Sequence, residues 1–195
     1  MNVITPQDVL DFWFGAPGSP EHDQPHRAWF VKSDAFDADI RTRFGAAIEQ
    51  ALAGGLRDWD AAGPQGVLAR ILVLDQFTRN AYRNTPQSFA GDALALAAAR
   101  GLVDAGQDGA LAPIRRAFVY LPYEHAEDAY LQERAVELFS NLAAGQPGFD
   151  EMLDYAHRHR GVIARFGRFP HRNPILGRAS TPDELQYLGQ PGAGF

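Results

Sequence analysis

The segment from residue 155 to residue 178 carries the side chains best suited to binding an anion. It holds six arginines, three histidines and no acidic residue, although the whole chain has a net charge of −6. Guanidinium groups bind carboxylates and phosphates through paired hydrogen bonds in a forked geometry. We therefore predict that Arg168 and Arg172 bind a small carboxylate or phosphate, with Asn173 beside them in the same proline-stiffened loop.

A second polar group continues an apolar helical stripe within residues 65–81. Leu68, Leu72, Asp75 and Arg79 follow one another at helical spacing, so one face changes from apolar to charged along its length. Asp75 and Arg79 are also four residues apart, which suits an ion pair within one helix. We predict that both line a ligand site, or alternatively that they form a structural salt bridge.

Histidines beside carboxylates are the residues that could move protons near neutral pH. His125 and His171, together with Glu127 or Asp128, supply the minimum that general acid–base catalysis needs. We assign catalytic roles to His125, Glu127 and His171. His159 interrupts an apolar stripe, so it is either a core residue or a ligand-binding residue. No serine lies in a recognisable nucleophile turn.

The basic residues have a structural alternative. The same arginines can pair with the protein's own acids, among them Asp75, Glu124, Glu127 and Asp128. Such a buried ionic network would hold three helices in register without any ligand. The two interpretations share one spatial prediction, which is that the segments around Asp75, His125 and Arg168 meet in the folded protein.

Neither a metal nor an organic cofactor is predicted. The chain has no cysteine, which excludes disulfides and thiolate metal sites. The acids and the histidine of residues 124–128 do not have the spacing of His-Glu-x-x-His or of the Glu-x-x-His of di-iron bundles.

Length and composition set the class of protein. A chain of 195 residues with a hydrophobic fraction of 46% can bury the core of one domain, so we predict a single domain over residues 1–195. The acidic balance argues against nucleic-acid binding. The first residues do not resemble a signal peptide, and no stretch is apolar enough to span a bilayer. We therefore expect a cytoplasmic protein that does not enter membranes.

The apolar spacing predicts helices throughout. Capping boxes begin helices after Thr5 and after Thr181, each with proline at the first helical position. Residues 65–81 and 124–144 each read as one continuous helix, and Pro122 is expected to interrupt the helix before the second of these. With no alternation typical of strands, we predict an all-α fold of seven to eight helices, antiparallel where the connections are short.

Several motifs together resemble one known family. They are Leu10-Asp11-Phe12-Trp13-Phe14, Trp29-Phe30, Leu74-Asp75-Gln76-Phe77-Thr78-Arg79-Asn80, Tyr120-Leu121-Pro122-Tyr123-Glu124-His125-Ala126-Glu127, Phe166-Gly167-Arg168-Phe169-Pro170-His171-Arg172-Asn173, Leu176-Gly177-Arg178 and Ser180-Thr181. Across nearly the whole chain this pattern resembles the bacterial family of unknown function numbered 924. Thr78 stands where the family usually has proline, and Ala126 where it usually has serine.

The resemblance implies a fold but no activity. It implies a helix-pair stack like that of the tetratricopeptide-repeat superfamily, although no repeat is visible in this sequence. If the family's serine took part in chemistry, Ala126 would weaken a catalytic role here.

Two functions from different classes follow from these observations. The first is a polar pocket that binds a small anion and hydrolyses a small ester or phosphate. The second is a protein-binding scaffold of the tetratricopeptide type, in which the polar residues form a structural ion network and surface aromatic residues bind a protein partner. The aromatic residues expected on that surface are Trp13, Trp29 and Trp59.

Overall fold

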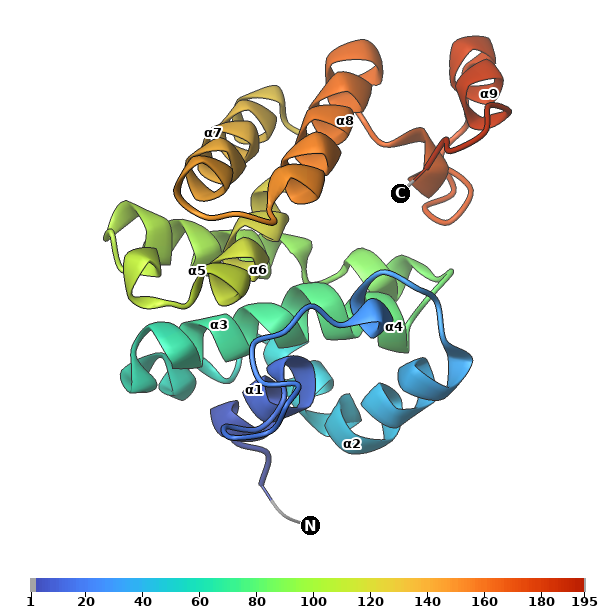
Figure 1. The fold of residues 1–195 in the computed structure, drawn as a ribbon. Coiled ribbons are helices and arrows are strands. Elements are labelled where there is room, and N and C mark those ends of the chain that lie inside the picture. Colours follow the sequence, from blue (N-terminus) through green and yellow to red (C-terminus); the bar gives the residue numbers. More distant parts are fainter. Residues whose placement is uncertain (1–2, 195) are drawn as a thin grey trace. The chain divides into compact units, whose positions relative to one another are not determined.

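The computed structural model describes residues 3–194, and within them every regular element is helical. This confirms the predicted all-α fold. The α-helices are α1 (Pro6–Phe14), α2 (Asp34–Leu52), α3 (Pro64–Leu72), α4 (Thr78–Ala81), α5 (Asp92–Asp104), α6 (Pro113–Glu124), α7 (Ala129–Gly145), α8 (Asp150–Phe166) and α9 (Pro182–Leu188) (Figure 1). Their number within the described residues is close to the seven or eight expected.

The chain divides into two compact units. The first unit is made of Met1–Arg83 and Gln87–Pro122, and the second of Asn84–Pro86 and Tyr123–Phe195. Each unit is described by itself below. The prediction of one domain over the whole chain stays a prediction.

The first unit begins with the predicted capping box. The Thr5 hydroxyl accepts a hydrogen bond from the Asp8 N–H (3.3 Å), and the Asp8 carboxylate accepts one from the Thr5 N–H (2.8 Å). These bonds satisfy amide groups that the first helical turn leaves without carbonyl partners. The helix α1 they begin packs Trp13 against Phe77 and Phe118, each with a ring-centroid distance of 5.6 Å.

The tryptophans do not form the surface that a scaffold would need. Trp13 and Trp59 are buried, with exposed fractions of 1% and 6%. Trp29 is half buried and donates its indole N–H to the carbonyl of Trp13 (3.0 Å). The prediction of a tryptophan-bearing binding surface is therefore wrong, because these large apolar rings gain more from burial in the core.

Residues 65–81 are not one regular helix. A π-helical turn, η3 (Val73–Phe77), separates α3 from α4. The close approach of Gly91 accompanies this turn, since a Cβ at position 91 would lie 2.0 Å from the carbonyl oxygen of Leu74. The Thr78 hydroxyl donates to that same carbonyl (2.7 Å), a bond that the family's usual proline could not make. Turns of this kind often occur at functional positions.

The boundaries near residue 124 also differ from the prediction. Pro122 lies inside α6 and does not interrupt it, because it falls in the last turn, where its missing N–H costs a single helical hydrogen bond. α7 begins only at Ala129, after Asp128 has capped it by accepting a hydrogen bond from the Leu131 N–H (2.9 Å). Residues 125–128 are thus a short connection, not part of a helix face.

The second unit is a helix pair followed by an ordered loop. α7 and α8 pack side by side and are joined by residues 146–149 (Figure 1). α8 ends at Gly167, whose φ of 70° is the left-handed conformation that favours glycine at a helix end. A short 3₁₀ turn, η6 (Pro170–Arg172), and the capped helix α9 complete the chain.

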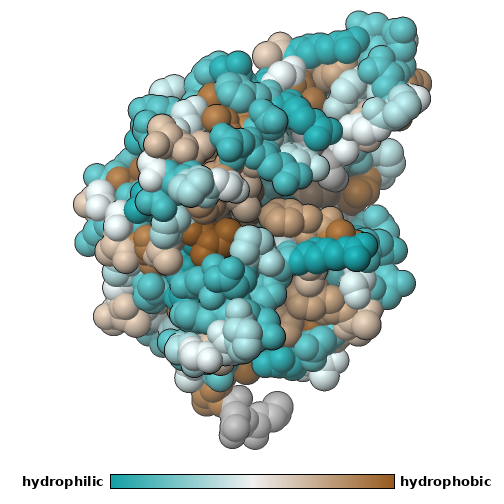
Figure 2. Space-filling view, viewed as in Figure 1, coloured by the Kyte–Doolittle hydropathy of each residue, from teal (hydrophilic) through white to brown (hydrophobic). Residues whose placement is uncertain are grey.

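A small apolar cluster supports that loop. Phe169 is fully buried with Val162 and Ile163 of α8, and Phe166 and Tyr187 pack against them. On the face shown in Figure 2, the part of the surface over α9 is mainly hydrophilic. Across residues 3–194, no helix is both long enough and apolar enough to cross a bilayer.

Candidate functional site

The buried ring of Phe169 is the centre of the polar residues in the second unit. The His159 ring meets it edge-on with a centroid distance of 5.5 Å, and the His171 ring lies 5.7 Å away. The Arg172 guanidinium lies over the ring at 4.6 Å, within range of a cation–π interaction. His159 of α8 and two loop residues at least 12 positions later, His171 and Arg172, therefore all lie against Phe169.

Glu127 fixes the loop that carries Phe169. Its carboxylate accepts two hydrogen bonds from the Arg178 guanidinium (2.6 and 2.9 Å) and a third from the Phe169 N–H (2.7 Å). Arg178 also donates to the Asn173 side-chain oxygen (2.9 Å) and to the Phe169 carbonyl (3.1 Å). Burial alone would raise the pKa of Glu127, but the bonds from Arg178 and Phe169 hold it below its usual value.

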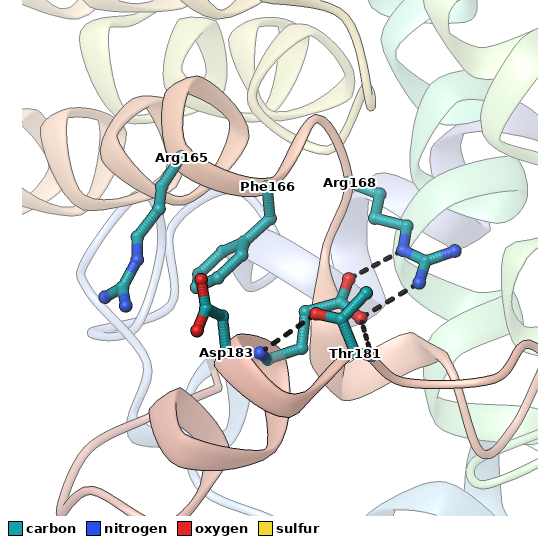
Figure 3. A pocket seen from close by; sticks show the side chains of 6 residues that line it. Arg165, Phe166, Arg168, Thr181 and Asp183 are labelled. Atoms are coloured by element: carbon teal, nitrogen blue, oxygen red, sulfur yellow. Dashed lines mark hydrogen bonds and ion pairs between the residues drawn. The ribbon is translucent and has the colours of Figure 1, made fainter.

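Arg168 is paired in the same way with a carboxylate of α9. It donates two hydrogen bonds to Glu184 (2.7 and 2.9 Å; Figure 3). It also donates one to the Ala179 carbonyl (2.8 Å). Glu184 also accepts the Thr181 N–H (2.7 Å), which completes the capping box. The bonds from Arg168 and then Thr181 lower the pKa of Glu184 to about 2. The predicted anion-binding arginine thus already holds an anion of its own chain.

Glu124, the last residue of α6, forms a buried pair with His159. One carboxylate oxygen, Oε1, lies 2.9 Å from the Nδ1 atom of His159, and the exposed fractions of the two residues are 3% and 6%. The Tyr155 carbonyl lies at the same distance from Nδ1. Because both neighbours are acceptors, Nδ1 carries the hydrogen, and Nε2 is the ring nitrogen that can accept a proton.

The other oxygen of Glu124 and the side-chain oxygen of the neighbouring Gln132 accept no hydrogen bond from the described residues. The Glu124 atom, Oε2, is buried. The turn around it is nevertheless fixed, because Gln132 of α7 donates to the backbone carbonyls of Glu124 (2.6 Å) and Ala126 (2.8 Å). Buried polar atoms nearly always have partners, so this oxygen of Glu124 is a position where a bound molecule could donate a hydrogen bond.

Two half-buried histidines lie beside this pair. The His125 ring is 6.3 Å from the His159 ring, and the His125 carbonyl accepts a hydrogen bond from Arg172 (3.0 Å). Burial, followed by the positive charge of Arg172 and the neighbouring His159, lowers the pKa of His171 to about 4. His171 is therefore neutral at pH 7 and can accept a hydrogen bond or a proton.

Asp75 and Arg79 form the predicted ion pair in the first unit. Asp75 is fully buried, and one of its carboxylate oxygens lies 2.9 Å from the Arg79 guanidinium. Arg79 also donates two hydrogen bonds to Asp92 of α5 (2.8 and 3.1 Å). Burial would lower the pKa of Arg79, but Asp75 and Asp92 raise it above its usual value.

A surface pocket of about 410 Å³ lies between the end of α8 and the start of α9. Its lining residues are Arg165, Phe166, Arg168, Thr181, Asp183 and Glu184 (Figure 3). Arg168 is the one predicted site residue among them. In the described part of the chain, no group of three or more histidines or acids is arranged to hold a metal ion.

The second unit thus brings together most of the predicted residues but not all of them. His125, Glu127, His159, His171, Arg172 and Asn173 lie around Phe169 or contact its immediate neighbours. Asp75 and Arg79 belong to the first unit, and their predicted meeting with the others stays a prediction.

Three important residues were missing from the predicted site. Glu124, Arg178 and Glu184 provide the partners of His159, Glu127 and Arg168. A sequence signal existed for Glu184 in the second capping box, and for Glu124 in its place beside His125. Arg178 lies 51 residues from Glu127, and no local pattern connects the two.

Comparisons with known proteins agree on a family. The chain matches the model of bacterial proteins of unknown function, DUF924, over residues 9–192. It is 40% identical to a protein of unknown function from Agrobacterium tumefaciens whose structure is solved, with a TM-score of 0.81 and a match that covers 94% of this chain and 96% of that one. No curated protein matches this chain significantly. The chain therefore belongs to the DUF924 family of bacterial proteins.

Proposed function

We propose that the second unit binds a small anionic molecule beside Phe169 and hydrolyses an ester or phosphate bond in it. The observation that carries this proposal is the buried Glu124–His159 pair, in which a carboxylate and a carbonyl fix the imidazole with Nε2 as the accepting nitrogen. A carboxylate that orients a histidine is a recurrent arrangement for general base catalysis.

The proposed reaction uses water as the nucleophile. His159 Nε2 takes a proton from water, and the water oxygen forms a bond to the acyl carbon or the phosphorus. The bond from that atom to the leaving oxygen then breaks, and the proton held by His159 passes to the leaving oxygen. Glu124 stabilises the transient imidazolium, as carboxylates paired with catalytic histidines do.

The surrounding residues suit an anionic substrate. Arg172 is a permanent cation that lies over the Phe169 ring and donates a hydrogen bond to the His125 carbonyl. His171, neutral at pH 7 because of burial and Arg172, would accept a hydrogen bond from a hydroxyl of the substrate. In this proposal Glu127 and Asn173 position the loop and do not touch the substrate.

The experiment compares hydrolysis of three anionic substrates, 4-acetoxybenzoate, p-nitrophenyl phosphate and bis(p-nitrophenyl) phosphate, by the wild type and by His159→Gln. The variant is expected to lower kcat by about 10²–10⁴-fold, the usual contribution of a general base. His157→Gln is the matched control, since His157 is an exposed histidine of the same helix. Wild-type rates no higher than buffer on all three substrates, or full activity in His159→Gln, would reject the proposal.

The paired arginines favour a second candidate, a scaffold in which the ions are purely structural. Arg168 and Arg178 each hold an internal carboxylate through two hydrogen bonds. On this view Arg168→Ala lowers the melting temperature, and neither phosphate nor acetate raises it. The hydrolase proposal instead expects a rise in melting temperature that depends on anion concentration and persists in Arg168→Ala.

A further inference from the structure

The pocket between α8 and α9 is lined by two side chains of opposite charge that have no ion-pair partner among the described residues. Of its four charged lining residues, Arg168 and Glu184 neutralise each other through two hydrogen bonds. Arg165 and Asp183 remain, and neither forms a hydrogen bond or ion pair with any described residue. Both are exposed, one on the last turn of α8 and the other on the first turn of α9.

An aromatic surface lies between these charges and a neighbouring cavity. The Arg165 guanidinium is 4.6 Å from the centroid of the Phe166 ring, which itself packs 5.2 Å from the Tyr187 ring. Figure 3 shows the Phe166 ring directed toward α9, with the Asp183 carboxylate near it. A second cavity of about 270 Å³ shares Arg165 and Phe166 with the pocket and adds Tyr187 and Val162 to the lining.

The charge of the lining limits the chemistry of a ligand. A purely anionic ligand would meet the carboxylate of Asp183, and a purely cationic ligand would meet the guanidinium of Arg165. A zwitterion can satisfy both at once, and a flat apolar group attached to it would cover Phe166 and Tyr187. The pocket has a volume of about 410 Å³ and lies open to solvent, so a bound ligand would stay partly exposed.

We propose that this pocket binds the zwitterionic group of an aromatic amino acid, with the carboxylate at Arg165, the ammonium at Asp183 and the ring against Phe166 and Tyr187. This site is separate from the Glu124–His159 pair and does not depend on the proposed hydrolysis. Exposed ion pairs contribute little each, so the expected dissociation constant is on the order of millimolar.

Three probes that differ by one charge test this assignment. They are L-phenylalanine, 3-phenylpropionate, which lacks the ammonium, and phenethylamine, which lacks the carboxylate. Binding is followed by the NMR shifts of the backbone amides of Phe166 and Tyr187. L-phenylalanine is expected to bind about threefold to fivefold more tightly than either analogue.

Two variants identify the partner of each charge. Arg165→Gln should remove the preference for L-phenylalanine over phenethylamine, and Asp183→Asn should remove the preference over 3-phenylpropionate. Arg100→Gln, a change of an exposed arginine in the first unit, is the matched control and should alter neither. His159→Gln should also leave binding unchanged, which separates this site from the proposed hydrolase site.

The binding experiment can either support or overturn the zwitterion site. The stated preferences, lost one at a time in the two variants, support the zwitterion site. Equal binding of all three probes would overturn it, as would the absence of shifts at Phe166 and Tyr187 up to the solubility limit of L-phenylalanine.

Discussion

Glu127 and Glu124 are three residues apart in the chain, yet their surroundings differ sharply. Glu127 accepts two hydrogen bonds from Arg178 and one from the Phe169 N–H. Glu124 offers one oxygen to His159, while its other oxygen is buried with no partner in the described part of the chain. Both oxygens of Glu127 therefore accept hydrogen bonds within the described chain, whereas only one oxygen of Glu124 has a partner there.

This difference separates the structural role of a charge from its functional role. A carboxylate with all its bonds made holds a loop in place, and its removal leaves several donors unsatisfied. A buried carboxylate oxygen to which the chain supplies no donor adds no hydrogen bond to the fold, and it could accept one from a bound molecule. We therefore propose a structural role for the Glu127 region and a functional role for the Glu124 region, and three measurements can test that proposal.

The largest effect is expected from Glu127→Gln. Glutamine keeps one acceptor oxygen, but its NH₂ group would face the N–H donors of Arg178 and leave that cation without its counter-charge. The free energy of unfolding should fall by roughly 2–3 kcal/mol, measured by urea denaturation.

A matched surface pair provides the control. Glu133 accepts one hydrogen bond from Arg160 (3.0 Å), and its side chain is 65% exposed. Glu133→Gln should cost less than about 1 kcal/mol. Similar losses in the two variants would mean that the Glu127 pair contributes no more than an ordinary surface contact.

These contacts also indicate what the sequence can and cannot predict. Both capping boxes, at Thr5 and Thr181, follow from residues within one turn of each other, and both are present. The apolar spacing does not predict the π turn at residues 73–77, where Gly91 of a later segment closely approaches the Leu74 carbonyl.

The same reasoning applies to the site. The arginine-rich segment predicts partners of opposite charge, either an external anion or the protein's own acids, and Arg168 and Arg178 each bind a carboxylate of the chain. Binding of an external anion stays a prediction. The sequence names Glu127 among the possible internal partners, but it does not identify Glu184 and does not predict which arginine binds which acid. Ion pairs between residues far apart in the sequence are formed by tertiary packing. Local patterns in a single sequence do not predict which residues that packing brings together.

The second prediction concerns pH. The pKa of His171 is about 4 in the folded protein, against an ordinary value of 6.5, chiefly because burial disfavours its charged form. The unfolded chain therefore binds a proton first as the pH falls, and stability should decrease between pH 6.5 and pH 4 by about 2 kcal/mol from this residue. Above pH 6.5, His171 is mainly neutral in both the folded and the unfolded protein, so it adds little to the pH dependence of the free energy of unfolding.

His171→Gln should flatten that part of the stability curve. Glu184 does not interfere, because its pKa shifts from 4.5 to about 2 and its stabilisation is lost only below pH 4.5. The measurement is a series of urea denaturations from pH 8 to pH 4 on the wild type and the variant. An unchanged slope in His171→Gln would show that other groups cause the acid sensitivity.

The smallest effect on stability is expected from Glu124→Gln, the same change made three residues from Glu127. The amide oxygen of glutamine can still accept the His159 N–H, and its NH₂ group replaces an oxygen that accepts nothing from the described chain. The free energy of unfolding should change by less than about 1 kcal/mol. A loss as large as that of Glu127→Gln would mean that the second oxygen has a structural donor. In that case the fold alone would explain the Glu124–His159 pair, and general base catalysis by His159 would have no structural support.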